Sequence, residues 1–74
     1  MIGELESVVL EVDMPQKGLL RGDIGVVALV HDQGAGYEVE FSTLDGETMA
    51  VITLLADQIR PASGREIAHA RSVS

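Results

Sequence analysis

The amino-acid sequence predicts an all-β domain built from five short strands. Apolar and polar residues alternate strictly along Tyr37–Phe41, which is the period of a strand with one buried face. The same alternation is present at Ser7–Val12. Asp45-Gly46 follows the first of these segments, and this dipeptide is typical of tight hairpin turns. These three features predict antiparallel strands joined by short connections.

The first half of the chain contains two predicted strands separated by a long loop. Ser7–Val12 is the first strand, and Asp13–Gly22 is a loop because Pro15 and Gly18 interrupt the pattern. Ile24–His31 is the second strand, with apolar residues on both faces, as in a strand that bends between two layers. Gly25 within it predicts a bulge or a sharp bend. The composition of residues 32–36 predicts a turn.

The predicted hairpin fixes a cross-strand register. A two-residue turn at Asp45-Gly46 pairs positions whose numbers sum to 91. On the buried face the predicted pairs are Tyr37 with Leu54, Val39 with Ile52, and Phe41 with Ala50. On the outward face they are Glu38 with Thr53, Glu40 with Val51, and Ser42 with Met49. Every inward residue therefore has an apolar partner, which supports this register.

The last predicted strand precedes a tail of different composition. Ala56–Gln58 predicts a short turn of 3₁₀ type, and Ile59–Pro61 a brief strand that its proline confines to an edge or an end. We expect the folded domain to span residues 1–62. Residues 63–74 form a tail, either a short helix over Arg65–Arg71 or a disordered segment. Docking of this tail through Ile67 is the simplest way to cover the second apolar face of the Ile24–His31 strand.

Charge and composition exclude several classes of function. The 74 residues carry a net charge of −7 and no cysteine, so one small domain must be stabilised by packing or by a partner. Residues 1–59 have a net charge of −9 and residues 60–74 a net charge of +2. An acidic body repels phosphate backbones and anionic membrane surfaces. We therefore expect neither nucleic-acid nor membrane binding.

The residues that could support catalysis are too few and too scattered for a reaction centre. His31 and His69 are the only histidines, and no pair has metal-ligand spacing. The aspartates fall at or beside turns, where they bond to local backbone. We expect no enzyme activity, no cofactor and no metal. The absence of cysteine and of a secretory or membrane-spanning segment favours a cytoplasmic location.

Four stretches carry a resemblance to a known family, namely Leu20–Val27, Tyr37–Phe41, Ala56–Pro61 and Arg65–His69. They resemble an uncharacterised family of small bacterial and cyanobacterial SH3-like proteins, a domain of unknown function. That family is similar to the barrel of the nitrile hydratase β subunit, to the small SH3-like component of photosystem I and to the variable chain of ferredoxin–thioredoxin reductase. The resemblance implies a five-stranded SH3-like barrel that acts as a non-catalytic part of an assembly.

These observations lead us to expect a non-catalytic module that binds a protein partner, for which a basic protein is one candidate, or a second copy of itself. The acidic positions Glu38 and Glu40, with Glu47 nearby, lie beside the outward apolar residues Met49 and Val51. The candidate contact residues are Glu38, Glu40, Met49, Val51, Arg65, Ile67 and Arg71. An antitoxin or immunity-type protein that neutralises a basic partner, and an accessory subunit of an enzyme complex, are the alternatives.

Overall fold

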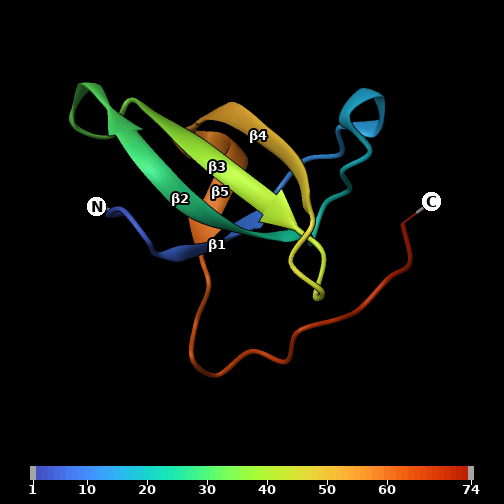
Figure 1. The fold of residues 1–74 in the computed structure, drawn as a ribbon. Helices are drawn as coiled ribbons and strands as arrows, with labels where there is room; N and C mark the ends of the chain where they lie inside the picture. The colour runs from blue at the N-terminus through green and yellow to red at the C-terminus, as the bar shows by residue number, and fades with distance from the viewer. Residues whose placement is uncertain (1, 74) are drawn as a thin grey trace.

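The computed structural model describes residues 2–73, and its five antiparallel strands form one sheet in the order β4-β3-β2-β1-β5 (Figure 1). The strands are β1 (Ser7–Leu10), β2 (Ile24–His31), β3 (Gly36–Ser42), β4 (Thr48–Leu55) and β5 (Ile59–Pro61). Single turns of 3₁₀ helix lie between them: η1 (Pro15–Lys17), η2 (Asp32–Gly34) and η3 (Ala56–Gln58). The predicted all-β, five-stranded class is confirmed. Met1 and Ser74, the ends of the predicted domain and tail, lie outside the described residues.

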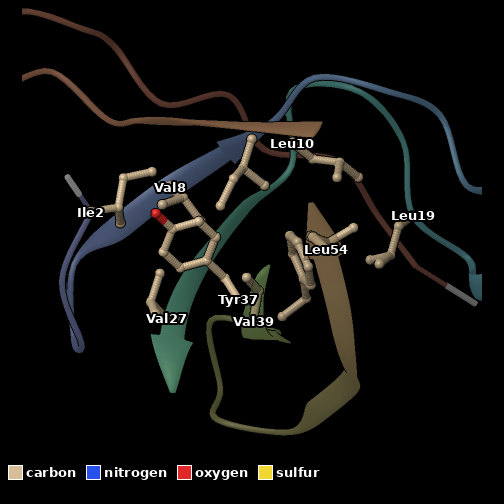
Figure 2. Packing of buried hydrophobic residues seen from close by; sticks show 10 residues of the cluster. Ile2, Val8, Leu10, Leu19, Val27, Tyr37, Val39 and Leu54 are labelled. Atoms are coloured by element: carbon tan, nitrogen blue, oxygen red, sulfur yellow. The ribbon is translucent and has the colours of Figure 1, made fainter. Parts of the chain in front are cut away.

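Side chains from all five strands meet in one core, so the sheet curls around it like a small barrel (Figure 2). The fully buried side chains are Leu10, Leu54, Val8, Val27 and Val39. They come from β1, β2, β3 and β4, and Ile59 of β5 joins the same cluster. A chain this short buries only about 60% of the surface its unfolded form exposes, so this one cluster supplies most of the stability.

The β3–β4 register is as predicted over most of the hairpin, but the turn is different. Tyr37, Val39 and Phe41 pair with Leu54, Ile52 and Ala50. The turn is a three-residue loop over 44–46, because the Thr43 amide donates to the Glu47 carbonyl at 2.8 Å and the Gly46 amide to the Thr43 carbonyl at 3.0 Å. Gly46 has φ +94°, as this kind of loop requires.

The longer turn shifts the strand pairing at the start of β4. Ser42 pairs with Thr48 rather than with Met49, and the register shifts between Phe41 and Ser42. Met49 is therefore an extra residue that restores the predicted register beyond it. The Thr43 hydroxyl stabilises the longer loop, because it donates to the Asp45 carboxylate and accepts from the Glu47 amide at 3.0 Å.

The predicted bulge of β2 exists, but not at Gly25. Gly25 pairs regularly with Val8, and the irregularity lies between Val27 and Leu29, where Ala28 is the extra residue. Before Ala28, Val27 points into the core; after it, Val30 packs against the core. The bulge therefore brings Val27 and Val30, which strict alternation would place on opposite faces, to the same core, while Val26 and Leu29 stay exposed on the outer face. Glycine is needed at position 25 for a different reason, the close approach of β3.

The first strand is shorter than predicted. β1 ends at Leu10 rather than Val12, and the Glu11 amide after it still donates to the Gln58 carbonyl of η3 at 2.8 Å, in the same register as the β1–β5 pairs. The long loop after it is confirmed and contains η1 and an isolated bridge between Met14 and Leu19. The η3 turn and the edge position of β5 are also as predicted.

The tail after β5 contains no helix between Ala62 and Val73. In Figure 1 it runs away from β5 and returns toward the long first loop near its end. Docking through Ile67 is wrong, because 88% of this side chain is exposed. The tail is held by polar contacts instead, because Glu66 and Arg71 form ion pairs with Arg60 and Asp23.

Candidate interaction surface

Two carboxylates lie among exposed apolar side chains on the outer face of β2, β3 and β4. Glu40 of β3 sits between Val26 of β2 and Val51 of β4, and Glu38 lies opposite Leu29 of β2. Cross-strand partners share one face of a sheet and lie close enough to interact. Val26, Leu29 and Val51 are 40%, 45% and 54% exposed. We call these five residues the acidic–apolar face.

The two carboxylates are held in place by uncharged or weakly basic neighbours. Glu38 Oε2 lies 2.6 Å from His31 Nε2, and Glu40 accepts a hydrogen bond of 2.6 Å from the Thr48 hydroxyl. Within residues 2–73, neither Glu38 nor Glu40 forms an ion pair with Lys or Arg. Their positions are therefore defined while their negative charge stays available to an external cation.

Met49 and Val51 occupy different parts of the surface. Val51 belongs to the acidic–apolar face. Met49, the extra residue of β4, lines a groove between the β3–β4 loop and the end of the tail. Ile24, Leu44 and Val73 also line this groove. The structure thus brings Glu38, Glu40 and Val51 together, and places Met49 at the boundary with the tail.

The end of the tail is fixed to the domain by Arg71. Its Nε and Nη2 atoms donate to the two carboxylate oxygens of Asp23 at 2.8 and 2.6 Å, and Nη2 also donates to the Gly18 carbonyl at 2.9 Å. The bidentate geometry is the strongest form of this ion pair. The Arg71 guanidinium holds the pKa of Asp23 below its ordinary value, with the Leu20 amide as a smaller contributor.

The start of the tail is folded back by a second ion pair. Arg60 donates to both oxygens of Glu66 at 2.8 and 2.6 Å, and its Nε lies 3.5 Å from Glu11. The Ser63 amide donates to Glu66 at 2.6 Å. The Arg60 hydrogen bonds, followed by this amide, lower the pKa of Glu66 to about 2.

Of the three predicted tail residues, only the Arg71 side chain forms hydrogen bonds or an ion pair with the folded domain in residues 2–73. Arg65 and Ile67 are exposed, and the Arg65 amide bonds only to the nearby Ser63 hydroxyl. Sequence reasoning treated Asp23 as an ordinary turn residue and so missed the anchor of the tail. The opposite charges of residues 1–59 and 60–74 were the available signal, but they do not say which carboxylate is used.

Acidification is expected to release the tail. The pKa of Asp23 is lowered from 3.8 in the folded state, so the ion pair stabilises the docked tail above that ordinary value. The contribution is lost as the pH falls through the lowered pKa, when the carboxylate is protonated. Backbone ¹⁵N relaxation of residues 70–73, next to Arg71, should therefore stay constant from neutral pH to about pH 4 and show fast motion below it.

The matched variant for this experiment is Arg71→Ala. At residues 70–73 it should show fast motion already at neutral pH and no further change on acidification, while Arg65→Ala should behave like the wild type. Residues near Glu66 should still respond to acid in every variant, because the Arg60–Glu66 ion pair is lost as the pH falls toward about 2. An Arg71→Ala protein whose tail keeps its order at neutral pH would show that other contacts hold the tail.

Neither a metal cluster nor a membrane-spanning helix is found in the part of the chain that the structure describes. No group of three or more metal-ligating side chains is close together within residues 2–73. Over the same residues, no helix has the length and apolar character needed to cross a membrane.

The fold and this surface define a small all-β domain with an exposed acidic–apolar face and a tethered tail. The chain belongs to the family described as Domain of unknown function (DUF4926), whose model matches residues 4–61. The match includes all five strands and ends at the last residue of β5. No curated protein and no solved structure matches the chain.

Proposed function

We propose that this domain is a non-catalytic protein-interaction module whose acidic–apolar face binds a basic protein partner. The observation that carries the proposal is the placement of Glu38 and Glu40 between exposed apolar residues of both neighbouring strands. Apolar burial would supply affinity, and the carboxylates would select a partner of opposite charge. The net charge of −7 would speed the encounter.

The SH3-like relationship, the bacterial origin and the cytoplasmic location are part of the same proposal. The long first loop, the β3–β4 hairpin and the 3₁₀ turn before the last strand support an SH3-like relationship. The bacterial origin is proposed from the resemblance of the sequence alone. The sequence contains no cysteine, which supports a cytoplasmic setting. An antitoxin or immunity-type role is one form of this binding function, favoured by the acidic body. It would require a small basic protein that is toxic when expressed alone.

The test compares two double charge reversals that have the same net charge. Glu38→Lys/Glu40→Lys alters the face, whereas Glu4→Lys/Asp57→Lys alters two exposed acidic positions outside it. Tagged proteins are used to capture partners from lysate of the host, and bound proteins are identified by mass spectrometry. We expect a basic protein to bind the wild type and the control variant, and to be lost from the face variant.

Three results would oppose the proposal. Equal loss from both variants would indicate capture by net charge alone, and equal retention would remove the face from the interface. Circular dichroism of each variant checks that it is folded, so that loss of the partner is not caused by unfolding. Gel filtration tests self-association: a dimer that returns to monomer in Met49→Lys/Val51→Lys would identify a second copy as the occupant instead.

A further inference from the structure

One border of the sheet is a long strand without the usual protection against further pairing. β4 has eight residues, none of them charged and none of them proline. Within the described residues, its backbone pairs with β3, and beyond that ladder only the Leu55 amide is bonded, to the Gln58 side chain. Half of the amides and carbonyls of an antiparallel edge strand point away from its single neighbour. They are available to another strand.

The opposite border shows how such an edge is normally protected. β5 has only three residues, contains Arg60 and ends at Pro61. Short length, charge and proline all discourage pairing with a further strand. The tail continues from this border and is folded back by Glu66. The contrast between the two borders singles out β4.

The side chains beside the free border define what an added strand would need. On the inner side, Ala50 and Ile52 are half-buried at the margin of the core. On the outer side, Val51 and Leu55 are exposed. Alternate residues of an added strand would lie against these two rows. Its inward residues must therefore be apolar to extend the core.

The outward residues of an added strand would face the two carboxylates across β4. Glu40 and Glu38 are the cross-strand partners of Val51 and Thr53, one strand inward from the border. An added strand would lie two strand spacings, about 10 Å, from β3. An Arg or Lys side chain can span this gap together with the Glu side chain, because its aliphatic stem packs on Val51 while its charged end reaches the carboxylate.

We propose that β4 accepts an extended segment of a partner protein as a sixth strand, in which apolar residues alternate with Arg or Lys. This inference rests on the proposed function for the charge of the partner and adds the conformation in which it binds. The cations supply the charge complement to Glu38 and Glu40, which no Lys or Arg of residues 2–73 contacts. A second copy fits less well, because β4 itself carries no cation to offer them.

The test uses synthetic peptides of eight residues with blocked ends. The probe alternates valine and arginine. One control has the same composition with four valines followed by four arginines, and another replaces every arginine by glutamate. Binding is measured by fluorescence anisotropy, and amide hydrogen exchange is followed by NMR. The alternating valine–arginine peptide should bind best and slow exchange by about tenfold or more at those β4 amides that β3 leaves free.

Two modifications separate backbone pairing from charge. Two peptides are N-methylated at every second residue, one at the odd and one at the even positions. Only one of them should lose binding, because only half of the peptide amides would face β4. Glu38→Gln/Glu40→Gln should weaken binding by about tenfold, the effect of losing two exposed ion pairs. The matched Glu4→Gln/Asp57→Asn variant should bind as the wild type does.

Each other result overturns the inference. Equal binding of the block peptide, with shifts at Glu38 and Glu40 but no protection of β4, would reject strand addition and leave the proposed face function standing. Equal binding of the glutamate peptide would reject the basic partner. Failure of every peptide would reject β4 as an acceptor, and protection of β4 in a peptide-free dimer would assign the edge to a second copy. Loss of the captured basic protein in Glu38→Lys/Glu40→Lys tests the proposed function separately.

Discussion

Leu54→Ala is expected to remove most of the stability of the domain. Leu54 is fully buried where β4 meets the core, and it pairs with Tyr37. Removing a buried leucine side chain costs about 2–5 kcal/mol, because apolar burial is lost and a cavity remains. A domain of this size has only about 3–5 kcal/mol of net stability. Urea denaturation followed by circular dichroism should show the midpoint shifted most of the way toward zero urea.

The adjacent leucine provides the control. Leu55 is 57% exposed on the other face of the same strand. Leu55→Ala should change the free energy of unfolding by no more than about 0.5 kcal/mol, as surface substitutions usually do. The two variants differ by one position and share the same chemistry. Similar losses of stability in both variants would mean that Leu54 and Leu55 do not lie on opposite faces of β4, one buried and one exposed.

Gly25→Ala is expected to have the next largest effect. A methyl group at position 25 would lie 2.6 Å from Val39 Cγ1, 2.9 Å from Phe41 Cε1 and 3.0 Å from the Glu40 carbonyl oxygen. Side chains could move slightly, but the backbone oxygen and the packed core cannot. Overpacking of this kind costs about 1–3 kcal/mol, which is a large part of the stability of so small a domain. The midpoint of urea denaturation should fall accordingly.

Gly64→Ala is the matched control for this substitution. Gly64 has nothing within 4 Å of the added carbon and does not have a positive φ. Its replacement should leave the midpoint unchanged or raise it slightly, because alanine reduces the freedom of the unfolded chain. A Gly25→Ala protein as stable as Gly64→Ala would contradict the close packing of β2 against β3.

The sequence predicts the strands well where one face is apolar and the other polar. Along Tyr37–Phe41 a slip of one residue would expose every buried side chain, so the alternation specifies both the strand and its register. The loop at Thr43–Glu47 was harder to predict, because Asp45-Gly46 suits both a two-residue and a three-residue connection. The choice depends on the Thr43 hydroxyl and on the extra residue at Met49, which alternation does not reveal.

The candidate site was predictable to the same extent. Glu38, Glu40 and Val51 follow from the register of one hairpin, and the structure places them together. The contributions of Val26 and Leu29 depend on the bulge at Ala28, which sequence reasoning placed at Gly25. Arg71 and Asp23 are 48 positions apart, and no local pattern connects them. Long-range polar contacts of this kind need the folded chain to be seen.

The extra residue at Ala28 also affects how this strand can vary between related proteins. Val27 and Val30 reach the same core only because one surplus position stands between their two phases. Exchanging one aliphatic residue for another along β2 alters packing locally. Removing the codon for Ala28 would instead take the bulge away, with Leu29 still opposite Glu38 and Val30 still on the face of Val27. Related chains can therefore carry or lack a residue at this position without a change in which later side chains of β2 face the core.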